Sequence, residues 1–261
     1  MEMKMKKIRV TVWNEYRHET TDGIAHPKRV GDDLVREIYP HGIHGAIKEA
    51  LDLDGDFEVR CAWLDQDSEH GLSEEVLNNT DVLFWWGHCA HGEVKNEVVD
   101  RIQARVLAGM GLVVLHSGHK SKIFMRMMGT TCDLKWRVAD EKERVWRVES
   151  AHPIAAGVPD NFLVPNTEMY GERFDIPTPK DTVFISWYEG GEVFRSGVTF
   201  ERGLGRIFYF APGHETYPIY YDENIRKVLC NAAKWCAPRI WGTPGCIRVE
   251  QPLEEIKSVR V

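Results

Sequence analysis

The sequence predicts an α/β protein built on a parallel β-sheet, and three observations support this class. The first half alternates short β-branched or apolar runs with amphipathic stretches about every 25–30 residues, as in βαβ units. Two of the runs, at 81–86 and 111–115, are almost entirely apolar, as expected of strands covered on both faces. The length of 261 residues suffices for one large domain with its own core.

The elements of the first half follow in a regular order. Besides the two apolar strands, we expect strands at 8–13 and 57–63, and helices at 28–38, 43–51, from Ser73, 93–107 and 120–128. Pro27 suits the first turn of the first helix, and Ser73 can cap the helix that follows it. Right-handed crossovers then place the carboxyl ends of the strands along one edge of the sheet.

The second half is predicted to be rich in β-strands. Residues 136–148 and 182–210 have strand patterns, with a hairpin turn at 202–206. The segment 153–179 holds five of the 12 prolines and is expected to run over the surface. A last helix is expected at 222–236. We therefore predict one domain over residues 1–237 and an extended tail over 238–261.

Composition excludes several classes of protein. The net charge is −7 and no long Lys/Arg block is present, which argues against a nucleic-acid partner. No apolar run reaches the roughly 18–20 residues needed to cross a bilayer, which argues against a membrane protein. The six cysteines form no C-x-x-C pair and favour reduced thiols over a disulfide scaffold. The basic start leads into a strand, not into a signal-peptide apolar region, so the predicted location is the cytoplasm.

Histidines stand at four of the predicted strand ends. In chain order they are His18, His88 with His91, His116 with His119, and His214. Ligands of an open α/β sheet bind beyond the carboxyl ends of its strands. We therefore expect His18, His88, His116 and His214 to share a pocket, as ligands of a divalent metal such as Zn²⁺ or as acid–base groups. For each histidine taken alone, a structural role is the alternative.

Acidic and aromatic side chains near the same strand ends complete the predicted site. Glu15 or Glu215 is the expected base, and His116 and His214 are the other expected catalytic residues. Flat aromatic faces beside carboxylates suit a sugar, and the carboxylates in question are Glu15, Glu19, Glu168, Glu172 and Glu215. The expected substrate-binding residues are Trp13, Trp86, Tyr170 and Tyr217. Core packing is the alternative for Trp85 or Trp86, since alternate strand residues face opposite sides.

Two further residues are candidate nucleophiles. Ser117 lies between a strand and a helix, but Leu115 and His119 replace the glycines of a G-x-S-x-G elbow, so a helix N-cap is favoured. Cys89 lies between two histidines that would favour a thiolate, but an inert buried thiol is favoured. A serine hydrolase that uses Ser117 and His214 therefore ranks last among the functions considered.

The same segments resemble the ThuA-like (trehalose utilisation) family. The resembling stretches span roughly residues 8–237 and are Val12–Glu19, Ile38–His44, Val82–His91, Gly109–His119, Lys135–Arg137, Glu168–Pro177, Phe184–Phe194 and Ile207–Tyr217. The resemblance implies a class I glutamine-amidotransferase-like fold, which is a flavodoxin-like, three-layer parallel sheet, here with a β-rich second half. It also implies a role in disaccharide catabolism, with keto-sugars among the substrates considered.

The resemblance does not extend to glutamine hydrolysis. Amidotransferases of this class have a Cys nucleophile after a central strand and a His-x-Glu pair late in the chain. Here His116 and Ser117 stand at the equivalent strand end, and Glu215 follows His214 directly.

The predicted function is therefore that of a sugar hydrolase, lyase or isomerase with a His-lined, metal-binding pocket and no nucleotide cofactor. The alternative is a non-catalytic small-molecule-binding or regulatory module on the same scaffold. Apolar surface on the β-rich half leaves a homo-oligomer open.

Overall fold

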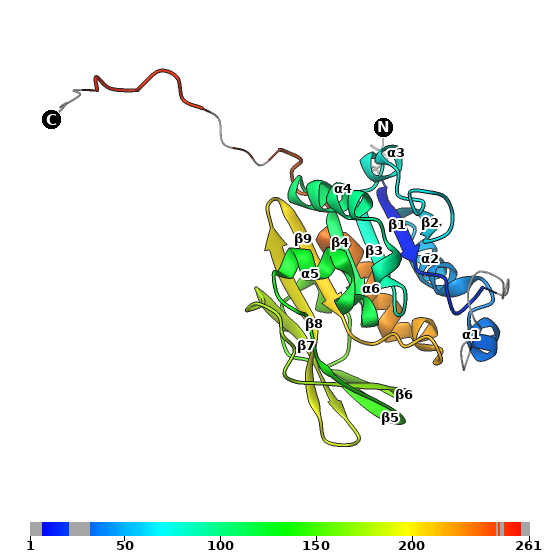
Figure 1. Cartoon of the computed structure of the whole chain (residues 1–261). Helices are drawn as coiled ribbons and strands as arrows, with labels where there is room; N and C mark the ends of the chain where they lie inside the picture. The colour runs from blue at the N-terminus through cyan, green and yellow to red at the C-terminus, as the bar shows by residue number, and fades with distance from the viewer. Residues whose placement is uncertain (1–6, 21–31, 244, 246–247, 257–261) are drawn as a thin grey trace, which may run out of the picture.

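A nine-stranded sheet runs through the protein in the order β2-β1-β3-β4-β9-β8-β7-β5-β6 (Figure 1). It is seen in a computed structural model that describes residues 7–20, 32–243, 245 and 248–256. The first five strands of the order are parallel: β2 (Phe57–Trp63), β1 (Ile8–Asn14), β3 (Val82–Trp86), β4 (Gly111–Leu115) and β9 (Gly205–Phe210). This order is that of a flavodoxin-like sheet. The predicted fold class is confirmed.

The remaining four strands extend the sheet in antiparallel fashion. They are β8 (Val193–Arg202), β7 (Asp181–Tyr188), β5 (Lys135–Arg147) and β6 (Asn161–Gly171). A tight turn joins β8 to β9, and Gly203 within it has a φ of 58°, a left-handed conformation that glycine adopts without steric cost. The predicted β-rich second half and its hairpin are confirmed.

The prediction that the proline-rich segment 153–179 only runs over the surface is wrong for its central part. Residues 161–171 form β6, which pairs with β5 alone because it is the last strand of the sheet. Pro165 lies outside the paired positions of this ladder. An edge strand tolerates proline because one side of its backbone needs no ladder hydrogen bond.

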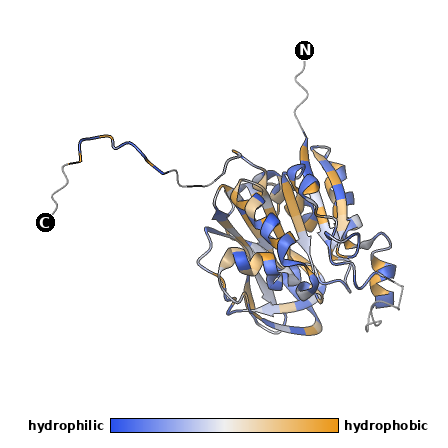
Figure 2. Ribbon diagram, turned by 45° about the horizontal axis from the view of Figure 1, so that its top comes forward, coloured by the Kyte–Doolittle hydropathy of each residue, from blue (hydrophilic) through white to orange (hydrophobic). Residues whose placement is uncertain are grey.

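Helices cover both faces of the parallel part of the sheet. Side chains of β3 alternate between two apolar cores: Val82, Phe84 and Trp86 pack on one face, and Leu83 and Trp85 on the other. The first core includes α1 (Asp32–Ile38), α2 (Gly42–Asp54) and α6 (Glu223–Cys236); the second includes α3 (Glu74–Asn78), α4 (Asn96–Leu107) and α5 (Lys122–Met128). Figure 2 shows largely apolar central strands and helices along which hydrophilic and hydrophobic residues alternate.

Most predicted helix boundaries agree with the structure. Ser73 caps α3, since its Oγ accepts a hydrogen bond from the Val76 amide at 3.3 Å. Ser121, not Ser117, caps α5. Pro27 and residues 28–31 of the first predicted helix lie outside the described residues. The described part of the tail, 238–243, 245 and 248–256, contains neither helix nor strand, and no helix in the described ranges is long and apolar enough to span a bilayer.

Candidate functional site

Four strands of the sheet end in one row. Asn14 of β1 is paired with Trp86 of β3, Trp86 with Leu115 of β4, and Leu115 with Phe210 of β9. Because these strands are parallel, the loops that follow them leave the sheet at the same edge. These loops carry His18, His88, His116 and His214, and a short 3₁₀ helix, η2 (His116–Lys120), begins directly after β4.

Three donor atoms from three of these loops form a compact cluster, which we call the His18 triangle: His18, His88 and Glu215. His18 Nε2 lies 3.1 Å from His88 Nδ1, and His88 Nδ1 lies 3.1 Å from Glu215 Oε1. The third side, from His18 Nε2 to Glu215 Oε1, is 3.6 Å. A tetrahedral Zn²⁺ with ligands at about 2.0–2.1 Å has donor atoms roughly 3.3 Å apart. The spacing of the triangle fits three ligands of such an ion and leaves a fourth position.

A carboxylate on the far side of the His18 ring from the triangle selects the tautomer of that ring. Asp32 Oδ1, at the start of α1, lies 3.0 Å from His18 Nδ1, and both side chains are buried. This contact holds the proton on Nδ1 and leaves the Nε2 lone pair facing the triangle. Sequence reasoning missed Asp32, because only helical periodicity is visible around it.

A second group, which we call the His116 cluster, consists of His116, Glu168 and His214. Each offers a donor atom within 4.8 Å of the other two. His116 Nδ1 lies 2.7 Å from the Ala211 carbonyl oxygen, so it carries the ring proton, and the lone pair of Nε2 faces Glu168 Oε2 at 3.0 Å. That oxygen is buried and has no hydrogen-bond partner. Two facing acceptors require a proton or a cation between them.

Burial and charge shift the pKa values of these groups in opposite directions. Burial alone would raise the pKa of Glu215, but its hydrogen bond with His88 and the nearby histidines outweigh burial and hold it well below its ordinary value. Burial would lower the pKa of His88, but Glu215 outweighs it and the pKa is raised. Burial lowers the pKa of His214 to about 4 and that of His119 to about 3, which keeps both rings neutral.

A cavity of about 220 Å³ lies beside the two groups. Residues that line it include His88, His119, Glu168, Tyr170 and Trp136. The Tyr170 ring stacks on His116 with centroids 4.7 Å apart, and its hydroxyl lies 2.9 Å from Ser117 Oγ. Typical ligand pockets measure roughly 300–1,000 Å³. The cavity is therefore of a size for one small ring. We call it the inner cavity.

The predicted substrate-binding roles of Trp13 and Trp86 are wrong. Both are buried in the two cores, with 1% and 0% of their surface exposed. Trp13 stacks on Trp85 at 3.9 Å, and the Trp86 indole N–H donates to the Gly213 carbonyl. Core packing, the alternative interpretation, holds for these side chains and for Trp85. Of the two predicted tyrosines, Tyr170 lines the inner cavity, whereas Tyr217 lies beside His214 and hydrogen-bonds Asp140.

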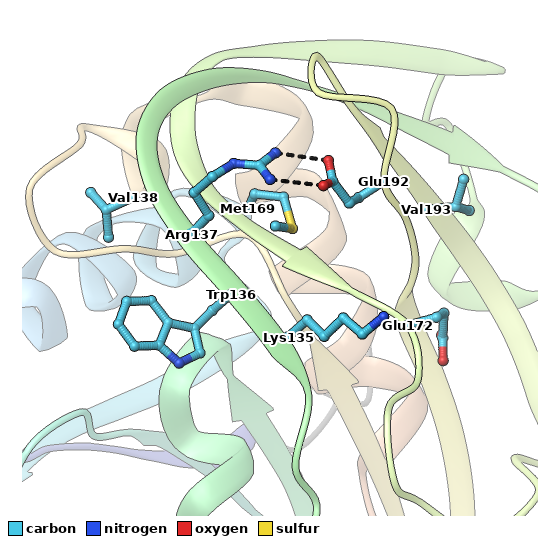
Figure 3. Close-up of a pocket in the computed structure, with 8 residues that line it drawn as sticks. All are labelled: Lys135, Trp136, Arg137, Val138, Met169, Glu172, Glu192 and Val193. Carbon is cyan, nitrogen blue, oxygen red and sulfur yellow. Dashed lines mark hydrogen bonds and ion pairs between the residues drawn. The ribbon is translucent and has the colours of Figure 1, made fainter.

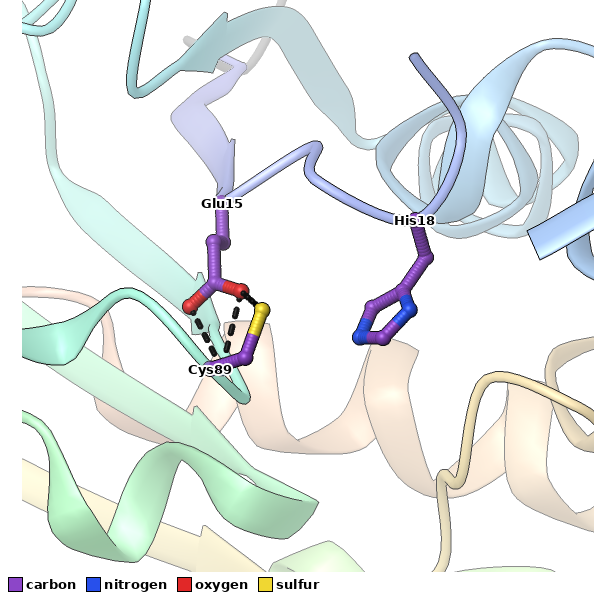
Figure 4. Close-up of side chains that lie close together, drawn as sticks. All are labelled: Glu15, His18 and Cys89. Carbon is purple, nitrogen blue, oxygen red and sulfur yellow. Dashed lines mark hydrogen bonds between the residues drawn. The ribbon is translucent and has the colours of Figure 1, made fainter. Parts of the chain in front are cut away.

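The structure gives Glu15 a role other than the predicted base. Its two oxygens accept hydrogen bonds from the backbone amides of His88, Cys89 and Ala90, at 2.7–3.0 Å, and from the Cys89 thiol at 2.6 Å. Figure 4 shows this carboxylate turned toward Cys89, with the His18 ring apart from the pair. Glu15, His18 and Cys89 are close enough to hold a metal. Both Glu15 oxygens, however, already accept hydrogen bonds from the loop that carries His88.

The turn after β4 is strained. His116 has a φ of 47°, a left-handed conformation that is uncommon for a bulky residue at a strand-to-helix junction. The fold that carries this turn is a flavodoxin-like parallel sheet with an antiparallel extension. The chain matches the ThuA family, described as trehalose utilisation, over residues 9–236, and it belongs to that family.

Solved structures agree with this assignment at the level of the fold. A putative ThuA-like protein from Parabacteroides merdae has a TM-score of 0.65 at 15% identity, covering 92% of this chain and 93% of its own. One from Bacteroides uniformis has a TM-score of 0.62 at 15% identity, covering 89% and 92%. A cytoplasmic protein from Salmonella typhimurium has a TM-score of 0.56 at 12% identity, covering 89% and 100%. No curated protein matches the chain.

Proposed function

We propose that this protein is a metal-dependent enzyme that acts on a small sugar derivative. The observation that carries the proposal is the His18 triangle, whose sides of 3.1, 3.1 and 3.6 Å suit one divalent ion. Two imidazoles and one carboxylate with an open fourth position are a donor set used by catalytic zinc sites. The family description, trehalose utilisation, supports a sugar as the substrate class.

An ion in the triangle would polarise a carbonyl oxygen or lower the pKa of a bound water to about 7. The His116 cluster would supply proton transfer, because His116 Nε2 lies 3.0 Å from Glu168 Oε2 and 3.2 Å from the Tyr170 hydroxyl. His214 would donate a hydrogen bond to the substrate. Its Nδ1 accepts a hydrogen bond from the Thr216 amide at 3.2 Å, so the neutral ring carries its proton on Nε2.

Metal analysis tests the proposal without knowledge of the substrate. We expect the purified protein, loaded with Zn²⁺ and desalted, to retain about one ion per chain by elemental analysis. His88→Ala should lose that ion. His41→Ala is the matched control, because His41 is an exposed histidine at the start of α2. Equal metal content in all three proteins would refute the metal site.

A second candidate is a non-catalytic binding module, which is supported by the residues that follow β4: His116 and Ser117 stand where the resemblance would place the Cys nucleophile of an amidotransferase. Such a module would bind a sugar equally well before and after treatment with a chelator, and it would turn over none. The metal-dependent enzyme would lose both binding of a carbonyl-bearing sugar and turnover when the ion is removed. A homo-oligomer and a cytoplasmic location stay predictions.

A further inference from the structure

One face of the antiparallel extension carries apolar side chains where solvent-facing side chains are normally polar. A row of paired residues crosses four strands: Leu163 of β6, Arg144 of β5, Trp187 of β7 and Val193 of β8. Side chains at paired positions lie on the same face of a sheet. Trp146 lies two residues from Arg144 on β5 and therefore faces the same way. We call these residues the Trp187 face.

The Trp187 face is open to solvent in the single chain. Its four apolar side chains are each between 44% and 48% exposed. The other side of the same strands packs in the core, where Val145 of β5 is paired with Phe162 of β6 and both are buried. The extension therefore has one buried apolar face and one exposed apolar face. A contiguous exposed patch of this kind marks an interaction surface.

Polar residues adjoin the Trp187 face at the end where Val193 lies. Val193 and Arg137 line a groove of about 760 Å³ there. Figure 3 shows Glu192, the residue before Val193, turned toward Arg137, to which it is joined by two hydrogen bonds of 2.8 Å. Lys142 and Glu189 form a further ion pair at 3.2 Å. An apolar centre with a rim that carries both signs of charge is the usual anatomy of a protein–protein interface.

Arg144 indicates which partner the Trp187 face fits. In the described part of the chain its guanidinium hydrogen-bonds Asn161 Oδ1 at 2.5 Å and forms no ion pair. It lies between Trp187, its partner across the strands, and Trp146 on its own strand. A guanidinium is attracted to the face of an indole ring. Because each copy of the chain offers both groups, a two-fold axis can place the Arg144 of each copy against an indole of the other.

The size of the Trp187 face also suits a second copy. Four strands at about 4.8 Å spacing and the eight residues of β7 at about 3.4 Å each span roughly 19 by 27 Å, or about 500 Å² before side-chain relief is counted. A stable interface buries about 800 Å² on each partner, so the face and its rim suffice. The edge of the sheet is less suited to contact, since Pro165 in β6 lacks a backbone N–H donor.

We propose that the Trp187 face is the contact surface between two copies of this chain, packed face to face about a two-fold axis. Trp146, Trp187 and Leu163 are then buried at the centre of the interface. Tryptophan and arginine are the residues most enriched at such centres. The proposal goes beyond the proposed function and is independent of it, because it requires neither a metal nor a substrate.

Sedimentation equilibrium of the full-length protein at about 1–100 μM tests the proposal. We expect the wild type to be a dimer. Trp187→Asp and Leu163→Lys should each raise the dissociation constant of the dimer at least about tenfold, because each places a charge at the centre of the interface. Trp241→Asp is the matched control, since Trp241 is an exposed tryptophan that lies over Arg105, outside the Trp187 face. Far-UV circular dichroism shows whether each variant is folded.

Three results would overturn the proposal. The first is a wild type that is monomeric at 100 μM, the highest concentration of the series. The second is a dimer whose dissociation constant is unchanged in folded Trp187→Asp and Leu163→Lys, which would place the contact on another surface. The third is an assembly with an odd number of copies, which two-fold pairing of the Trp187 face cannot produce.

Discussion

The Nδ1 atom of His18 lies 3.0 Å from Oδ1 of Asp32, within a buried pair at the start of α1. A carboxylate in this position orients a metal-binding imidazole and increases its basicity. The pair links the N-terminal loop to the His18 triangle. It also gives a test of the site that leaves every proposed ligand in place.

Asp32→Asn should weaken Zn²⁺ binding by about 10–100-fold, the usual effect of losing such a supporting carboxylate. The amide keeps the size of the side chain but lacks its charge. A competition titration with a chromophoric chelator measures the affinity. Asp33→Asn is the control, since Asp33 is an exposed neighbour. Unchanged affinity in Asp32→Asn would mean that His18 does not bind the ion.

Glu168→Gln separates the roles of the two groups of side chains. If the His116 cluster transfers protons while the triangle holds the ion, this change should lower the turnover of a sugar substrate by about 10²–10⁴-fold and leave the zinc content unchanged. Turnover and elemental analysis are measured on the same preparation. Loss of zinc from Glu168→Gln would instead place the ion in the His116 cluster.

Glu15→Gln should destabilise the fold by about 2 kcal/mol, because a carboxylate that accepts from three backbone amides is replaced by an amide with one acceptor oxygen. Urea denaturation measures the change. Glu97→Gln, an exposed change in α4, should be neutral. A Glu15→Gln variant that is as stable as the wild type but inactive would restore the predicted role of Glu15 as the base.

Glu143→Gln should change the pH dependence of stability. Burial raises the pKa of Glu143 to about 7, above its ordinary value of 4.5. The folded state therefore binds the proton more tightly than the unfolded state, and stability falls as the pH rises from 4.5 to 7. The full loss, about 3 kcal/mol, is present above pH 7. The variant should gain up to this amount at pH 8.5 and little at pH 4.5.

Urea denaturation at the two pH values checks this difference. Glu149→Gln is the control, as Glu149 is exposed. A gain of equal size at pH 4.5 and pH 8.5 would show that the Glu143 proton is not involved.

Ser117→Ala should keep the turnover of the wild type within about threefold, since the Ser117 hydroxyl contacts Tyr170 and no described histidine hydrogen-bonds it. A fluorophosphonate probe should label neither protein. Labelling of the wild type that disappears in Ser117→Ala would revive the serine hydrolase.

The sequence alone determined the parallel half of the fold and the loops that carry the site. Apolar runs such as 111–115 are visible because a strand buried on both faces needs nearly every side chain to be apolar. Four histidines at strand ends predicted that the site lies at one edge of the sheet, because the carboxyl ends of parallel strands meet there. The aromatic residues were harder to interpret. An apolar strand that contains Trp13 or Trp86 looks the same in the sequence whether the tryptophan packs in a core or binds a ligand.

Only the tertiary structure decided which atoms face each other. Asp32 lies in a helix after the His18 loop, and Glu168 lies in β6, whose strand pattern is interrupted by Pro165. Whether a carboxylate is a base or a loop anchor depends on which amides fold around it, as for Glu15. Side-chain contacts of this kind depend on packing across the whole chain, so local sequence patterns do not predict them.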